Sequence, residues 1–153
     1  MRCLPGADAD GLAPLVDAEQ RAALLPDWMA RLAALGGQDV GSRLKLSRAE
    51  QTALKQTVSA LGENRASVAA YRFGAEAASR AALIRAATLG SDPLADHAAI
   101  SLGATAKFPL RAADLIARGA VPGPALGDAL AQAEKRWIDS GFSLDKAALL
   151  DGP

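Results

Sequence analysis

The sequence predicts an all-α protein, and three observations support that prediction. Hydrophobic residues make up 50% of the 153 residues but aromatic residues only 4%, so we expect a core built from Ala, Leu, Ile and Val. Alanine favours helices, whereas sheets favour β-branched and aromatic side chains. The chain has no run of alternating Val, Ile or Tyr of the kind that is typical of a strand. Glycine and proline then divide the chain into a multi-helical array of short to medium helices.

Capping residues and glycines set the predicted helices in the first half of the chain. These helices span residues 11–25, 26–35, 47–62, 65–73 and 75–89. Gly36-Gly37 ends the second helix, and residues 36–42 form the most linker-like stretch. Ser47 and Glu50 have the spacing of a capping box, in which the serine accepts from a first-turn N–H and the glutamate reaches back. The last two of these segments are consecutive helices broken near Gly74, or one helix that is kinked there.

Prolines organise the second half of the chain. The predicted helices span residues 92–106, 110–118 and 124–140, with a last turn or two after Ser143. Asp92-Pro93 has the pattern of an N-cap followed by proline at the first helical position. Pro109 interrupts the chain because proline disfavours helical geometry in the residue before it. We expect three segments, 1–42, 43–106 and 107–153, within one compact unit. The buried stripe of the long helix is Leu126, Leu130, Ala133 and Trp137.

Charge is balanced overall but unevenly distributed. The chain holds 17 basic and 17 acidic residues. Residues 1–40 hold three Arg and six acids, whereas residues 43–85 hold eight Lys or Arg and three Glu. Such segregation favours one electropositive face. Ordinary solvated helix faces are an equally good interpretation of the charges alone.

Residue types that carry catalysis are scarce. His97 is the only histidine and Cys3 the only cysteine, so a multi-histidine metal site, a Cys-His site and an internal disulfide are not expected. No phosphate-binding loop or nucleophile elbow occurs. We therefore expect no enzyme activity, metal or cofactor in this chain alone. The lack of an apolar run of about 20 residues and of a signal peptide predicts a cytoplasmic protein that does not enter membranes.

Residues 108–127 form the most specific motif, a helix, a tight turn and a second helix. Gly119 and Gly123 permit the turn, Pro124 pre-sets the helix, and Gly127 lets another backbone come close. The exposed amides of such a helix start favour an anion, for example a nucleic-acid phosphate. A plain helical hairpin, whose glycines serve packing alone, is the alternative interpretation.

This motif resembles the C-terminal part of bacterial CCA-adding enzymes, the tRNA nucleotidyltransferases of the poly(A) polymerase family. The resemblance rests on Phe-Pro-Leu-x-x-x-Asp-Leu-Ile-x-x-Gly-x-x-Pro-Gly-Pro-x-Leu-Gly and on Trp137 and Phe142 after it. Residues 4–7 and 43–50 agree with the family in order and spacing. At 112–113 the chain has Ala-Ala where the family pattern leads us to expect a glycine, which weakens the argument for close backbone approach there.

The resemblance implies that the chain is the body and tail that grip tRNA, without the head that binds CTP or ATP and magnesium. Its expected partners are tRNA or another structured RNA and the missing head and neck, with a homodimer as a further possible assembly. The expected RNA-binding residues are Arg43, Lys45, Arg48, Lys107, Arg111, Arg118, Gly119, Gly123, Pro124, Gly127, Lys135 and Arg136.

Two other functions are compatible with the sequence. A helical protein-interaction or dimerisation domain without RNA binding would present a contiguous apolar patch. A small-molecule site between helices would require a cavity with converging polar groups.

Overall fold

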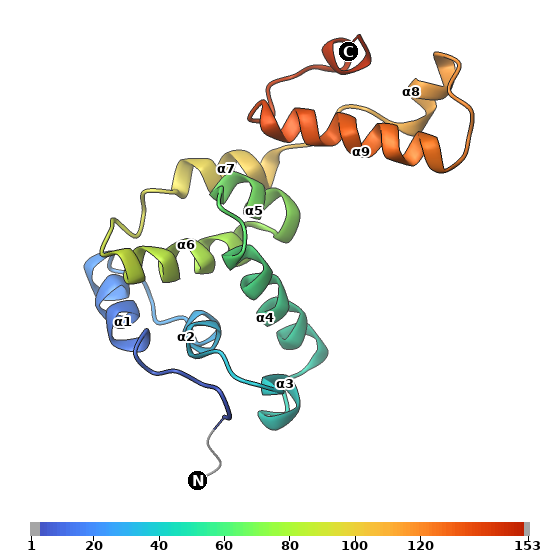
Figure 1. Cartoon of the computed structure of the whole chain (residues 1–153). Coiled ribbons are helices and arrows are strands. Elements are labelled where there is room, and N and C mark those ends of the chain that lie inside the picture. Colours follow the sequence, from blue (N-terminus) through green and yellow to red (C-terminus); the bar gives the residue numbers. More distant parts are fainter. Residues whose placement is uncertain (1–3, 152–153) are drawn as a thin grey trace. The chain divides into compact units, whose positions relative to one another are not determined.

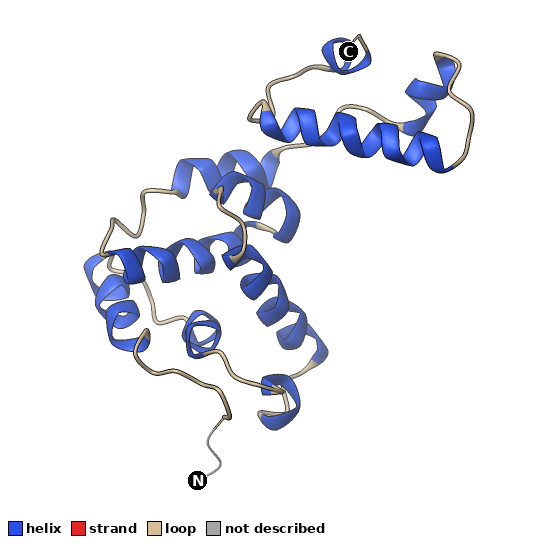
Figure 2. Cartoon of the chain, in the orientation of Figure 1, coloured by secondary structure: helices blue, strands red, loops and turns tan. Residues whose placement is uncertain are grey.

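The all-α prediction is confirmed over residues 4–151, which are the residues that the computed structural model describes (Figures 1 and 2). Cys3 lies outside this range. The helices within it are α1 (Leu12–Arg21), α2 (Trp28–Leu35), α3 (Val40–Arg43), α4 (Arg48–Leu61), α5 (Ala66–Phe73), α6 (Ala75–Leu89), α7 (His97–Thr105), α8 (Ala112–Ala117), α9 (Pro124–Asp139) and α10 (Lys146–Leu150). None of these described helices has the length and apolar character that a bilayer crossing requires.

The described chain divides into two compact units, with the boundary between Thr105 and Ala106. Unit 1 contains α1 to α7, and unit 2 contains α8 to α10. Segments 1–42 and 43–106 both contribute helices to unit 1, because α1 and α2 pack against α6, and α2 also packs against α4. The expectation that all three segments form one compact unit stays a prediction.

Helix α6 is the centre of unit 1, where it contacts α1, α2, α4, α5 and α7 (Figure 1). Its buried side chains are almost all methyl groups. They belong to Ala77, Ala78, Ala81, Ala82, Ala86 and Ala87, together with Leu83. Small side chains let helix backbones approach closely, so one helix can be surrounded by several neighbours. The alanine-rich composition noted in the sequence is therefore concentrated in the core of unit 1.

Helices α5 and α7 of unit 1 approach each other closely. Gly103 of α7 faces the backbone of Ser67 in the first turn of α5. A Cβ atom built on Gly103 would lie 1.9 Å from the Ser67 carbonyl oxygen. The neighbouring α7 residue Ile100 is 6% exposed and belongs to the same core as α5. Glycine at 103 is therefore needed for this crossing.

Unit 2 is built around Trp137 of α9. Its side chain is 3% exposed and lies between two other aromatic rings. The ring centroids of Phe108 and Phe142 lie 5.5 Å and 4.9 Å from that of Trp137, at tilted and edge-on angles of 58° and 71°. Leu126 and Ala133 continue the buried stripe of α9 as predicted, whereas Leu130 is half-buried.

Two details of the predicted elements were wrong. Helix α7 begins at His97 and not at Asp92, because the Asp92 carboxylate accepts from the Leu94 N–H and forms a separate turn. The linker-like stretch contains α3, which follows Asp39 in a left-handed conformation.

Candidate nucleic-acid interface

The turn between α3 and α4 has a rigid local structure. The Leu46 N–H donates to the Gly41 carbonyl (2.9 Å), and the Gln51 side-chain amide donates to the Leu46 carbonyl (2.8 Å). The predicted capping box is confirmed, because the Glu50 N–H donates to the Ser47 hydroxyl and the Ser47 N–H donates to the Glu50 carboxylate (2.7 Å). These bonds fix the backbone from which several basic side chains project.

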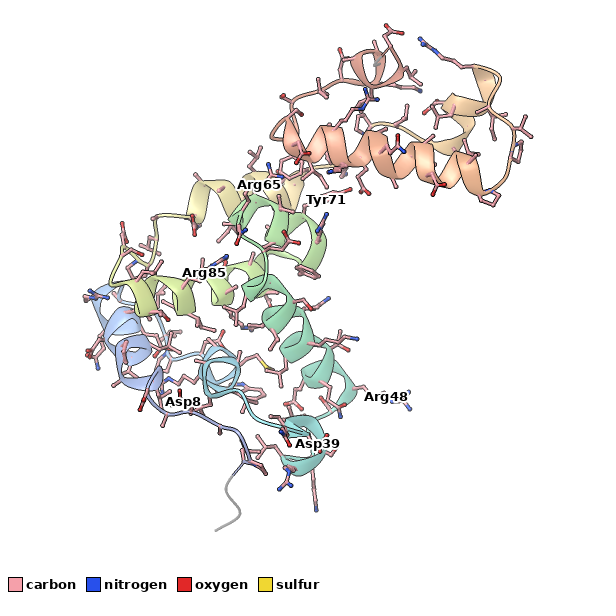
Figure 3. All side chains as sticks on the ribbon, viewed as in Figure 1. Asp8, Asp39, Arg48, Arg65, Tyr71 and Arg85 are labelled. Atoms are coloured by element: carbon pink, nitrogen blue, oxygen red, sulfur yellow. The ribbon has the colours of Figure 1, made fainter. Side chains whose placement is uncertain are left out.

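Three predicted RNA-binding cations lie on this turn or at its ends. Arg43, Lys45 and Arg48 are exposed, and within residues 4–151 none of them forms an ion pair or side-chain hydrogen bond. Figure 3 shows Arg48 projecting away from α4. Lys45 has a φ of +54°, which is uncommon for a residue with a side chain and is held here by the surrounding hydrogen bonds. The turn thus presents three positive charges to solvent.

Glu50 is the acidic residue of this turn, and it forms no ion pair with these cations in the described structure. Hydrogen bonds with the Ser47 side chain and then with the Ser47 N–H lower the pKa of Glu50. Lys55 is a fourth exposed cation without an ion pair among the described residues. It follows Arg48 by seven residues, so both lie on the same face of α4. Sequence reasoning missed Lys55, although this spacing would have indicated it.

The remaining basic residues of 43–85 include three that are engaged within unit 1. Arg72 pairs with Glu63 at 2.6 Å. Arg80 donates to Asp27 at 2.7 Å. Arg85 donates to the carbonyl of Glu63, while its second terminal nitrogen is buried without a hydrogen-bond partner in the described structure. The excess positive charge of residues 43–85 is therefore exposed to solvent chiefly at the α3–α4 turn and along α4.

The turn between α8 and α9 has the form that the sequence predicts. Gly119 has a φ of +95°, which favours glycine, and Gly123 precedes α9 without any side-chain cap. Pro124 is the first residue of α9. A Cβ atom built on Gly127 would meet no atom within 4 Å, so this face of α9 is open. The first turn of α9 therefore leaves backbone N–H groups without a side-chain acceptor from this chain.

Two predicted RNA-binding arginines of unit 2 hold its C-terminal helix. Arg118 donates to the Leu150 carbonyl (3.1 Å) and to the Asp151 carboxylate (2.8 Å). Arg136 donates to the Leu149 carbonyl (2.8 Å). Both side chains thus satisfy acceptors at the end of α10, which a helix leaves without internal partners. Their positive charge has a structural role in unit 2.

The other predicted cations of unit 2 differ in their surroundings. Lys107 and Lys135 are exposed and form no ion pair or side-chain hydrogen bond within the part of the chain that the structure describes. The backbone N–H of Arg111 donates to Asp114 (2.8 Å), which also accepts from Lys146. The hydrogen bonds from Lys146 and then from Arg111 lower the pKa of Asp114. Asp114 therefore stays ionised and caps α8.

No family model, curated protein or solved structure matches this chain. Among residues 4–151, no group of three or more His, Cys, Asp or Glu side chains is arranged to hold a metal ion. The predicted site residues thus form two groups, one at the α3–α4 turn of unit 1 and one around the α8–α9 turn of unit 2.

Proposed function

We propose that this chain binds the sugar-phosphate backbone of tRNA, as the body and tail of a nucleotidyltransferase of the poly(A) polymerase family. The α3–α4 turn is the observation that supports the proposal most. It presents Arg43, Lys45 and Arg48 without acidic partners, on a backbone held by hydrogen bonds and a capping box. Unpaired cations on a fixed backbone favour phosphate contacts, which position a nucleic acid without reading its sequence.

This mode of binding fits a protein that must accept every tRNA. Cations that neutralise phosphates release the counterions condensed on the nucleic acid, so the affinity depends steeply on salt. Duplex RNA is in any case recognised mainly by its shape and 2′-hydroxyl groups. Base-specific side chains are therefore not required for the proposed function.

The tail contributes a different kind of contact. The N–H groups at the start of α9 have no side-chain cap, and a phosphate is a suitable acceptor for them. Gly127 leaves that face of α9 open, and Lys107 and Lys135 supply charge. We assign Arg118 and Arg136 a weaker share in RNA binding, because both already donate to acceptors within unit 2.

The test is the affinity of the full chain for mixed tRNA across a salt series. We expect the logarithm of the association constant to fall linearly with the logarithm of salt concentration. A triple variant with Gln in place of Arg43, Lys45 and Arg48 should reduce the magnitude of that slope by about 2–3, since each lost phosphate contact removes about 0.7–0.9. Arg72→Gln is the matched control, because Arg72 belongs to the same basic stretch but pairs with Glu63.

Three outcomes would contradict the proposal. Failure of the wild-type chain to bind tRNA even at low salt would overturn RNA binding itself. An unchanged salt slope in the triple variant, with folding intact by circular dichroism, would remove the α3–α4 turn from the RNA contact surface. A slope that falls equally in the triple variant and in Arg72→Gln would show a nonspecific effect of charge.

A further inference from the structure

Unit 1 contains a cavity of about 390 Å³ that the RNA-binding proposal does not use. It lies between the α1–α2 loop, α6 and the beginning of α7. Buried Leu83 and Ile100 line it on the inside, at 7% and 6% exposure. Leu25 and Leu94 also line it but are 89% and 50% exposed. Large apolar side chains therefore surround an opening to solvent.

A chain of charged groups fixes one wall of the cavity before any ligand binds. The buried Glu19 carboxylate accepts from the Arg31 guanidinium (2.6 Å) and from the Asp27 N–H (3.2 Å). The Asp27 carboxylate caps α2 with one oxygen and accepts from Arg80 Nε with the other (2.7 Å). The α1–α2 loop is held further by the Leu24 N–H, which donates to the Glu19 carbonyl (2.9 Å). This wall is therefore preformed, as ligand pockets usually are.

Glu76 is the one carboxylate of the lining that retains free acceptor capacity. Its closest described contact is to Arg80 Nη2 at 3.6 Å, and its side chain is 87% exposed. Asp27, in contrast, accepts from three N–H donors. The lining holds two carboxylates and one guanidinium, so its net charge is negative when His97 is neutral.

We propose that this cavity binds a small molecule with an apolar body and one ammonium group. The apolar body contacts the buried Leu83 and Ile100 inside the cavity and the exposed Leu25 and Leu94 at its rim. The ammonium group pairs with Glu76 at the edge, where it stays partly hydrated. An anionic ligand is disfavoured, because Arg80 already donates to Asp27 and the net charge of the lining repels it. This inference does not rest on RNA binding.

The test is an NMR titration of the full ¹⁵N-labelled chain with three matched probes: phenethylamine, phenylacetate and phenethyl alcohol. Buffer at about pH 8 lies above the usual titration range of histidine. We expect phenethylamine to shift the amide signals of the cavity lining with a millimolar dissociation constant, as its size allows. Phenylacetate should bind at least threefold more weakly, since it lacks the pair with Glu76 and is repelled by the lining.

Two variants distinguish the contribution of the Glu76 charge to ligand binding from that of the cavity space. Glu76→Gln should weaken phenethylamine binding about two- to fivefold, the effect of one exposed ion pair. Asp10→Asn, which removes an exposed carboxylate outside the lining, is the charge-matched control and should change nothing. Ser79→Phe, at an exposed position of α6 that lines the cavity, should fill the space and abolish the shifts without disturbing the core.

The proposal is overturned if no probe shifts the lining, or if shifts persist unchanged in Ser79→Phe. Equal affinity for the three probes, or an unaltered affinity in Glu76→Gln, would overturn its ammonium part. The whole proposal is supported if the chain binds phenethylamine more tightly than the other two probes, and if Glu76→Gln and Ser79→Phe both weaken that binding.

Discussion

Replacing Gly103 with alanine tests the close crossing of α5 and α7. The added Cβ would lie 1.9 Å from the Ser67 carbonyl oxygen, and real Cβ atoms essentially never approach a heavy atom within 3.0 Å. The obstructing atom belongs to a helix backbone and cannot rotate away as a side chain can. The two helices must therefore move apart by at least about 1 Å locally.

The loss of folding stability that this separation causes can be estimated. A radial gap of about 0.5–1 Å already forfeits a quarter to a half of the dispersion energy of each contact. Overpacked cores typically lose about 1–3 kcal/mol. Because the displaced atoms are backbone, we expect Gly103→Ala to lie at the upper end, near 3 kcal/mol. For a unit of this size, each kcal/mol lowers Tm by about 4–8 °C, which predicts a decrease of roughly 12–24 °C.

The assay is urea and thermal unfolding followed by far-ultraviolet circular dichroism. Gly62→Ala is the matched control in the same unit, because its φ is −77° and its added Cβ meets only the Ser59 carbonyl oxygen at 3.4 Å. That change should leave stability within about 0.5 kcal/mol or raise it slightly, since alanine restricts the unfolded chain. A Gly103→Ala protein as stable as Gly62→Ala would refute the tight crossing.

Two further predictions concern hydrogen bonds that arginine side chains donate. Burial raises the pKa of Asp27, but the hydrogen bond from Arg80 and the capping N–H groups outweigh it, so the folded-state pKa lies below 3.8. A lowered pKa stabilises the folded state above 3.8, and this contribution disappears as pH falls through the folded value. Asp27→Asn, which can still cap α2, should cost about 1 kcal/mol at neutral pH, and its urea unfolding should converge with that of wild type in acid. In unit 2, Arg136→Gln should destabilise the fold by about 1 kcal/mol because it removes a bond to α10, whereas Lys135→Gln should not. Near-ultraviolet circular dichroism during thermal unfolding measures this difference, and equal effects would contradict the structural role of Arg136.

Helix boundaries were predictable where the signal is local. The capping box of Ser47 and Glu50 and the break at Gly74 depend only on residues within one turn, and both are confirmed. The start of α7 was not predictable in this way. Asp92-Pro93 suits a turn as well as a helix start, and the docking of Ile100 and Gly103 on α5 decides where regular helix begins.

The buried face of α4 consists of small residues. Thr57 and Ala60 are fully buried, whereas Val58 is half exposed. Close helix crossings select small side chains, and a hydrophobicity pattern gives weight to large ones. On α4 the small residues Thr57 and Ala60 therefore mark the buried face better than Val58 does.

The sequence predicted only part of the candidate site, because ion pairs join residues that lie far apart in the chain. The sequence identified the basic stretch, but Arg80 meets Asp27 across 53 residues and Arg118 meets Asp151 across 33. Neither pair has a local signature. The residues that stay unpaired, such as Arg48, became distinguishable only once these partners were placed.

The core around α6 is built mainly from alanine methyl groups, and this changes which substitutions destabilise the protein most. In most cores the damaging changes remove atoms and leave holes. Around Ala78 and Ala81, both at 0% exposure, there is little side chain left to remove, and the damaging changes are those that add atoms. A change from alanine to valine at either position adds two methyl groups where the neighbouring helices leave little room, and it should cost about 1–3 kcal/mol. Conservation in relatives of this unit should accordingly follow small volume more closely than hydrophobicity.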